Sequence, residues 1–271
     1  MLRIFCARFS NLFSCTHSMD GFMINPAVKP TLSIPLPSHG LRPSAKVSLY
    51  TDQAARLWEG AASVRSKTAR PSGAPSLLQA FSVLQALYNA TGSDNPFADA
   101  ALLRLEDGLA EVGATCKLRV STVAELLADR AAEGVETPLV TSEKRYSYEL
   151  VFGTPYHYML VDAIALLDKA MRHLMTVSLT GLLSGIQVRA AISELQRQML
   201  STLHNLVRDA SMLRRFNGYE VSRTVLREQT PAAVTFAAEW INRAHTPVTG
   251  EILDSNRRPM HVRAKGWKPR Q

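Results

Sequence analysis

Alternating polar and apolar positions predict a short strand early in the chain. Across residues 45–51, Val47 and Leu49 fall on one side of an extended backbone, a period of two that is typical of a strand with one buried face. Thr51 can cap a following helix, which we expect over residues 53–62. The opposite side of the strand carries Lys46, Ser48 and Tyr50. The strand is therefore half-buried and presents a polar face to solvent or to a partner.

Amphipathic helices are predicted for most of the remaining chain, because apolar residues recur there every three to four positions. These helices cover residues 76–88, 97–112, 121–132, 155–179, 187–214 and 231–243. Gly113 separates the second from the third, and Gly181 and Gly185 separate the two longest, which we expect to form an antiparallel hairpin and the main core. Alternation returns at 146–152, which is a second candidate strand. The predicted fold class is mostly α with one or two short β-strands, combining a ribbon-helix-helix-like element near residues 45–90 with a long antiparallel helical hairpin.

Composition separates two terminal segments from a central domain. Five prolines in residues 24–45 indicate a linker, so we expect residues 1–44 to be a disordered or extended N-terminal arm. Residues 45–256 are expected to form an α-rich domain. Residues 257–271 carry six bases, no acid and no apolar period, and are expected to be a basic disordered tail.

The cysteine count and the absence of a long apolar run favour a cytoplasmic protein. The most apolar predicted helix contains Asp162, Asp168, Lys169 and Arg172, so we expect no membrane span. The chain has three cysteines, which are too few for a disulfide framework and make a reducing compartment the default.

Charge is distributed unevenly and points to a polyanionic partner. Lys and Arg number 31 against 23 Asp and Glu, which gives a net charge of +8. Residues 51–150 hold 10 bases and 13 acids, whereas residues 151–271 hold 16 bases and 9 acids. Such asymmetry is typical of nucleic-acid binding, although a solvated basic tail would produce the same count.

Motifs that would indicate catalysis are missing from the sequence. No glycine-rich phosphate loop, C-x-x-C, H-E-x-x-H or G-x-S-x-G pattern occurs. His157 and His173 lie sixteen residues apart on one predicted helix, which is too far to share a metal ion. We therefore expect no enzymatic activity, no cofactor and no small-molecule substrate.

A strand followed by two helices suggests a β-ribbon that binds DNA. The strand at 45–51 can pair with a distant strand of its own chain or with a second protomer, and the second pairing would create a ribbon that fits the major groove. Loop bases and the start of the second helix would then contact phosphates. The candidate DNA-binding residues are Lys46, Ser48, Tyr50, Arg65, Lys67, Arg70, Ser72, Ser76, Lys144 and Arg145.

Residues 146–151 are an alternative source of the ribbon strand. One face of this segment offers Ser147, Glu149 and Val151, and the other is largely aromatic. We favour 45–51 as the ribbon strand. In segment 146–151, the face with Ser147 and Glu149 would bring an acid toward the duplex, and the helices that follow this segment are longer than a ribbon-helix-helix element uses.

Three motifs follow one another between Leu49 and Arg258. Residues Leu49 to Gly60 (LYTDQAARLWEG) have the form L-x-T-x-x-A-x-R-L-W-x-G, and residues Phe152 to Asp162 have the form F-x-x-P-x-x-Y…D. Residues Arg214 to Arg223 (RRFNGYEVSR) are similar to R-Y-x-F-x-G-v-t-R, with Thr224 where an acid is expected next. Together the three motifs resemble the AcaB-like regulators, which are related to proteins encoded on integrating conjugative elements.

The resemblance implies a homodimeric protein that binds double-stranded DNA through a ribbon-helix-helix element. It also implies a role as an activator of conjugative-transfer genes on a plasmid or integrative element. The alternative is a non-enzymatic scaffold or accessory protein of a conjugative element, which would use its helical hairpin for protein contacts. Sequence-selective retention of promoter DNA would distinguish the two hypotheses.

Overall fold

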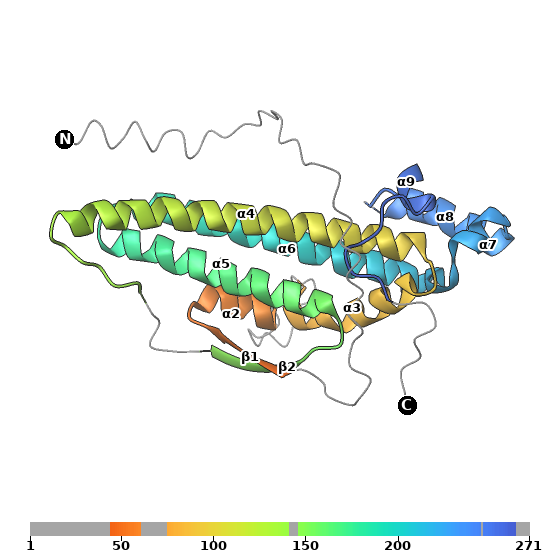
Figure 1. Cartoon of the computed structure of the whole chain (residues 1–271), viewed down its shortest axis with the longest axis horizontal. Helices are drawn as coiled ribbons and strands as arrows, with labels where there is room; N and C mark the ends of the chain where they lie inside the picture. The colour runs from red at the N-terminus through yellow and green to blue at the C-terminus, as the bar shows by residue number, and fades with distance from the viewer. Residues whose placement is uncertain (1–43, 61–74, 141–145, 245, 264–271) are drawn as a thin grey trace, which may run out of the picture. The chain divides into compact units, whose positions relative to one another are not determined.

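The computed structural model describes residues 44–60, 75–140, 146–244 and 246–263. All of the described residues belong to one compact unit, residues 42–271. Three long helices dominate this unit, and Figure 1 shows them side by side along most of their length. They are α4 (Pro96–Ala132), α5 (Pro155–Leu179) and α6 (Gly185–Arg215). The mostly helical fold class predicted from the sequence is confirmed.

The predicted hairpin of α5 and α6 is present, and α4 shares its core. The turn between the two helices contains Gly181 at φ +73°, a backbone conformation that suits glycine, and Ser184 caps the start of α6. Helix α4 packs along both partners, parallel to α5 and antiparallel to α6. The buried side chains that α5 and α6 turn inward include Leu160, Ile164, Leu167, Leu174, Leu195, Met199, Leu203 and Leu206.

Helix α4 is continuous, whereas the sequence predicted a break at Gly113. Asn95 caps its start and Pro96 occupies the first turn, where the missing N–H costs nothing. A mid-helix glycine costs only about 1 kcal/mol relative to alanine. The buried neighbours Val112 and Cys116 hold the helix together across this position, so packing overrides the local propensity.

A two-stranded antiparallel ribbon lies below the bundle in Figure 1. Strand β1 (Ser44–Leu49) pairs with β2 (Tyr146–Val151), with Lys46 opposite Glu149 and Ser48 opposite Ser147. The two segments treated as alternatives from the sequence are therefore partners in one ribbon. Both strands come from the same chain, and not, as the ribbon of a dimer would require, from two protomers.

Two helices follow β1 in the order predicted. Helix α2 (Asp52–Glu59) is capped by Thr51 and ends at Gly60, whose φ of +82° lies in the region that favours glycine. Helix α3 (Leu77–Thr91) is capped by Ser76. Helix α2 lies between the ribbon and α5, and α3 lies beyond α2, packed against α4 and α6 (Figure 1).

Short elements beyond α6 complete the described part of the chain. They are η2 (Gly218–Glu220), α7 (Arg223–Arg227), α8 (Pro231–Arg243) and α9 (Gly250–Leu253). Only α8 was predicted, with its start and end as observed. Its Phe236 and Trp240 pack on Phe97 at the start of α4, with ring centroids 4.7 and 5.2 Å away.

Part of the predicted disordered tail is ordered, which corrects that expectation for residues 257–263. The backbone N–H of Met260 donates to Glu106 at 2.7 Å, and the hydroxyl of Tyr156 donates to the carbonyl of His261 at 3.1 Å. The guanidinium of Arg263 donates to Asn89 at 2.6 Å. Polar partners on the helices fix this segment without any apolar period, so its sequence pattern did not reveal it. Residues 264–271 lie outside the described part.

Two kinds of feature are absent from the residues that the structure describes. None of the described helices combines the length and the apolar character needed to cross a lipid bilayer. Within the same residues, no three His, Cys, Asp or Glu side chains converge as ligands of a metal ion would.

Candidate nucleic-acid interface

The ribbon and α2 form one packed unit, which we call the ribbon unit (β1, β2 and α2). The ring of Tyr148 stacks on Trp58 of α2 with centroids 4.5 Å apart, and its hydroxyl donates to Glu59 at 3.0 Å. The hydroxyl of Tyr146 donates to Asp52 at 2.6 Å, which links β2 to the start of α2. Burial and the hydrogen bond to Glu59 raise the pKa of Tyr148, so this phenol remains a donor at neutral pH.

A single buried carboxylate attaches the ribbon unit to α5. Asp168 accepts hydrogen bonds from the backbone N–H groups of Tyr50 and Thr51 and from the Thr51 hydroxyl, at 3.1, 2.9 and 2.7 Å. The Thr51 hydroxyl also accepts from the N–H of Ala54 and so caps α2. Asp168 is 3% exposed, and all three of these donors are neutral. The β1–α2 turn therefore has a fixed position on the long helix.

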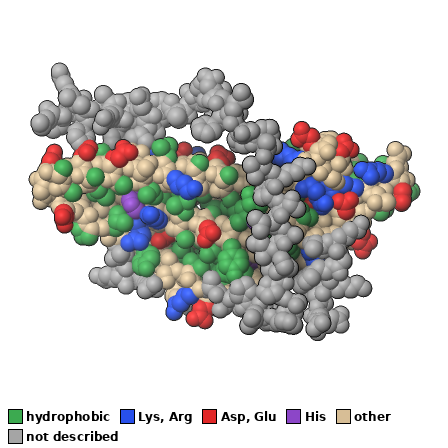
Figure 2. Space-filling model, viewed as in Figure 1, with side chains coloured by type: hydrophobic (Ala, Val, Ile, Leu, Met, Phe, Trp, Pro, Cys, Tyr) green, Lys and Arg blue, Asp and Glu red, His purple; other side chains and the backbone are tan. Residues whose placement is uncertain are grey.

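The outer face of the ribbon is polar and electrically balanced. Its described side chains are Lys46 and Ser48 from β1 and Ser147 and Glu149 from β2, all exposed except Ser48, which is partly buried. Val47 and Leu49 on the inner face are buried as the alternation predicted. Figure 2 shows blue and red side chains adjoining at the edge of the molecule where the ribbon lies. One cation and one anion give this face donors and acceptors without a net charge.

Tyr50 and Ser76, both predicted to bind DNA, contact other residues of the chain. Tyr50 lies one residue beyond β1, and the guanidinium of Arg172 sits 4.5 Å from the centre of its ring. Arg172 also donates to the carbonyl of Val140 at 3.0 Å. The hydroxyl of Ser76 accepts the N–H of Gln79 at 3.1 Å as the cap of α3. Lys46 and Ser48 are thus the only predicted contacts that the structure places on the outer face of the ribbon.

The remaining predicted contacts fall outside the described residues. These are Arg65, Lys67, Arg70, Ser72, Lys144 and Arg145. Their sequence positions border the ribbon unit, because residues 61–74 join α2 to α3 and residues 141–145 precede β2. The described residues carry 19 Lys and Arg against 21 Asp and Glu, whereas the other segments carry 12 bases and 2 acids. The positive charge of the protein therefore resides in the segments between and beyond the described elements.

Asp168 was not predicted to act at the ribbon, although the sequence contains a signal for it. It follows Leu167 and lies four residues after Ile164, so it falls on the apolar face of the long helix. A carboxylate there needs hydrogen-bond partners to be buried. The sequence does not show that those partners lie 117 residues earlier, in the β1–α2 turn.

Two residues of the third sequence motif, Gly218 and Arg223, have structural roles. Arg223, whose side chain is 2% exposed, forms ion pairs with Asp94 and Asp99, both at 2.8 Å. Arg258 pairs with the same two carboxylates at 3.5 and 3.1 Å. We call Asp94, Asp99, Arg223 and Arg258 the C-terminal clamp. Gly218 is needed because a Cβ there would lie 2.2 Å from the Phe236 ring.

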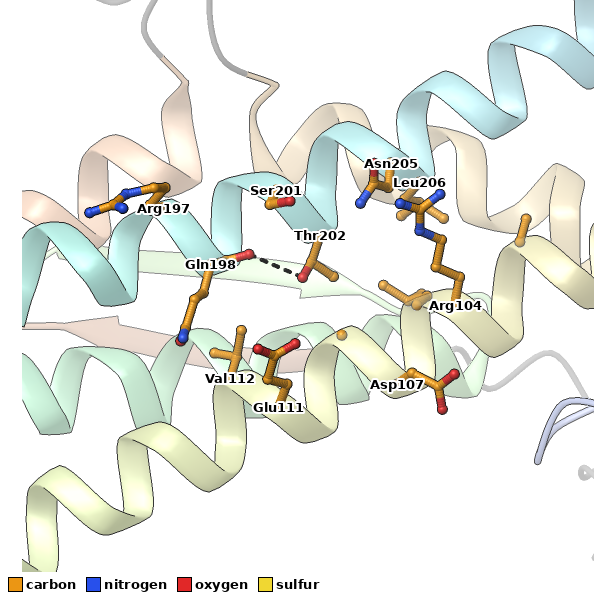
Figure 3. Close-up of a pocket in the computed structure, with 13 residues that line it drawn as sticks. Arg104, Asp107, Glu111, Val112, Arg197, Gln198, Ser201, Thr202, Asn205 and Leu206 are labelled. Carbon is orange, nitrogen blue, oxygen red and sulfur yellow. Dashed lines mark hydrogen bonds between the residues drawn. The ribbon is translucent and has the colours of Figure 1, made fainter. Parts of the chain in front are cut away.

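A groove between α4 and α6 has a volume of about 450 Å³. Figure 3 shows Arg104 reaching from α4 toward Asn205 and Leu206 of α6, while Asp107 points away. Gly108 allows the two helices to approach, because a Cβ there would lie 2.7 Å from the Thr202 hydroxyl. None of the predicted DNA-binding residues lines this groove.

Comparison with known proteins identifies the family. The family described as "Transcriptional regulator AcaB" matches residues 38–264. The crystal structure of selenomethionine-containing AcaB from uropathogenic E. coli is similar to this chain, with a TM-score of 0.51 and 13% sequence identity over 79% of this chain and 97% of that one. Among curated proteins, none matches the sequence. The family match spans most of the chain, from before β1 to the end of the ordered tail, and the chain belongs to the AcaB family of transcriptional regulators.

Proposed function

We propose that the chain regulates transcription as a homodimer that binds double-stranded DNA with sequence specificity. One observation carries this proposal: near the ribbon unit, the electrically balanced polar face and the excess of positive charge occupy different segments of the chain. The outer face of the ribbon is neutral and polar, whereas the neighbouring segments 61–74 and 141–145 hold five bases and one acid. Membership of a family of transcriptional regulators supports the same function.

This separation corresponds to the two tasks of a protein that binds specific DNA sites. Phosphate contacts provide affinity and position, and contacts to base edges provide specificity. Arg65, Lys67, Arg70, Lys144 and Arg145 are our candidates for phosphate contacts. A two-stranded antiparallel ribbon fits the major groove, where Lys donates to guanine, Glu accepts from cytosine and Ser does either. Lys46, Ser48, Ser147 and Glu149 are our candidates for base contacts.

The resemblance of the three sequence motifs supports a more specific role. We propose that the protein activates conjugative-transfer genes carried on a plasmid or an integrative element. A homodimer would place two ribbons on two half-sites, so its operator would be an inverted repeat. Sedimentation of the protein with and without operator DNA tests the dimer.

Selection of bound sequences from a random duplex library, followed by gel shifts of the enriched site, tests the function. Lys46→Ala and Glu149→Ala should each lower affinity for that site by about 1–3 kcal/mol and relax the preference at one base pair. Lys117→Ala removes one exposed cation from α4 and is the matched control. If no sequence is enriched, the protein is not a sequence-specific regulator, and the scaffold hypothesis replaces it.

A further inference from the structure

Two arginines lie over one aromatic ring at the far end of α6, and a third contacts one of them. Arg215 ends α6 and Arg243 ends α8, and the guanidinium carbon of each lies 5.5 Å from the centre of the Phe216 ring. Arg208, two turns before Arg215, donates to the carbonyl of Arg243. We call Arg208, Arg215 and Arg243 with Phe216 the arginine patch. It lies near α7 and α8, away from the ribbon (Figure 1).

One exposed face of α6 extends the patch along the helix. At 100° per residue, positions 204, 208, 211 and 215 share one side of the helix. They are His204, Arg208, Ser211 and Arg215, and Arg208 alone is partly buried. This side carries no acid, although the described residues together carry more acids than bases. The nearest carboxylate described in the patch is Glu239, which pairs with Arg243 at 2.6 Å.

We propose that the arginine patch binds the phosphate backbone of duplex DNA outside the segment that the ribbon contacts. This inference rests on the proposed function and adds a second contact region to it. A guanidinium stacked on an aromatic ring keeps its N–H edge available, and that edge matches phosphate oxygens in a bidentate arrangement. Hydroxyl and imidazole groups along the same face are further partners for phosphates.

The composition of the face favours DNA over a protein partner. Protein interfaces contain a core of apolar anchors, whereas DNA interfaces are polar and basic. On α6 the exposed large apolar side chain is Ile186 in the first turn, about six turns from Arg208, and none lies between residues 187 and 215. On α8, Val234 and Ile241 are exposed, but as single side chains. Cations at a helix C-terminus also offset the helix dipole, but Arg208 lies two turns inside α6 and is too far from its end for that role.

The test compares two double variants of α6 that remove equal charge from different faces. Arg208→Gln with Arg215→Gln removes two members of the patch. Arg189→Gln with Arg214→Gln is the matched control, because both arginines are exposed and lie about 80–120° around the same helix from Arg208 and Arg215. Circular dichroism and thermal unfolding confirm that each variant is folded.

Binding to a 40-base-pair duplex of mixed sequence is measured by fluorescence anisotropy across a salt series. Phosphate contacts are independent of sequence, so no operator is needed. In the patch variant, the slope of log affinity against log salt concentration should be shallower by about two, and the affinity at 0.15 M salt should be lower by roughly thirtyfold. In the control variant, both the slope and the affinity should stay closer to those of the wild type. The base preference found by library selection should be unchanged in the patch variant.

The outcomes separate this inference from the proposed function. A patch variant that binds duplex as tightly as the control overturns the inference, and this is the result expected if the patch binds an acidic protein. If the wild-type protein binds the mixed duplex but library selection enriches no sequence, the proposed sequence specificity is wrong. The salt series of the two variants then still decides whether the patch binds phosphates. A wild-type protein that binds no duplex overturns both.

Discussion

The ribbon unit and the C-terminal clamp are fixed to the helices in opposite ways. Asp168 holds the β1–α2 turn through three neutral donors. The clamp holds Arg223 and Arg258 through direct ion pairs with Asp94 and Asp99. Hydrogen bonds between a buried carboxylate and neutral donors are screened little by salt, whereas the partly exposed members of an ion cluster, here Asp94 and Arg258, are screened more. The proposed DNA-binding element is thus attached in a way that tolerates the ionic conditions that modulate DNA binding.

The two attachments also differ in how much is lost when one member is removed. Asp99 has no exposed side-chain surface and depends on two guanidiniums. Burial raises the pKa of Asp99 above its usual range, and the hydrogen bonds and charges of Arg223 and Arg258 offset only part of that rise. Loss of an arginine leaves a buried charge without compensation. Loss of the Asp168 carboxylate leaves buried neutral donors, which is less costly.

Arg223→Met should therefore have the largest effect. Removing one partner of a buried ion pair costs about 3–5 kcal/mol, and urea unfolding should show that loss in the free energy of unfolding. Arg227→Met is the control, because Arg227 is exposed on the same short helix. Equal stabilities of the two variants would show that the clamp does not stabilise the fold.

Asp168→Asn should follow with a loss of about 1–3 kcal/mol. The amide oxygen can take the place of Oδ1, which accepts from all three donors, but the NH2 group then faces the N–H of Tyr50, which lies 3.2 Å from Oδ2. The remaining hydrogen bonds also lose the charge of their acceptor, which weakens them. Asp162→Asn changes an exposed carboxylate on the same helix and should stay within about 0.5 kcal/mol. Hydrogen exchange should locate the loss in β1 and α2, and uniform loss of protection over all helices would contradict a local attachment.

Both attachments join parts of the chain that sequence periodicity cannot pair. Alternation placed Val47 and Leu49 inside the ribbon, but a period of two does not say which strand is the partner. The partner proved to be the other candidate segment, about a hundred residues away. Local rules predicted α2, α3, α5, α6 and α8, because caps and apolar stripes are short-range features.

The errors have physical causes that involve distant contacts. Gly113 does not break α4, because packing on both sides of it outweighs the local cost. The segment after Arg257 lacks an apolar period, yet acids on α4 fix it in place. For the candidate site, the sequence supplied Lys46 and Ser48, whereas the roles of Tyr50 and Asp168 depend on contacts with α5.

The ribbon side should also be the more sensitive of the two to acid. His157 accepts the N–H of Thr154 at Nδ1 and donates from Nε2 to the carbonyl of Phe81, which fits the neutral ring. Burial lowers the pKa of His157 below its usual 6.5, so the unfolded chain binds a proton more readily than the folded one. This contribution to stability is complete above about pH 6.5 and is lost as the pH falls toward the folded pKa.

Urea unfolding between pH 7.5 and 5 measures this effect. His157→Gln keeps a polar side chain without the titration, so its stability should fall less steeply below pH 6.5 than that of the wild type. His204→Gln is the control, since His204 is exposed on α6. Parallel curves for wild type and His157→Gln would show that the acid sensitivity originates elsewhere.

The smallest expected effects on stability come from the two tyrosines that join β2 to α2. Tyr148→Phe keeps the stacked contact with Trp58 and loses only the hydrogen bond to Glu59, which should cost about 1 kcal/mol. Both hydrogen bonds are exposed, but burial is the main cause of the raised pKa of Tyr148, whereas the hydrogen bond to Asp52 is the main cause at Tyr146. Water therefore replaces the lost partner more readily at Tyr146, and the effect of Tyr146→Phe on the free energy of unfolding should be smaller still. The double variant should equal the sum of the two, because each hydroxyl contacts a different carboxylate. A loss larger for Tyr146→Phe than for Tyr148→Phe would mean that the start of α2, and not its stacked end, carries the attachment of the ribbon.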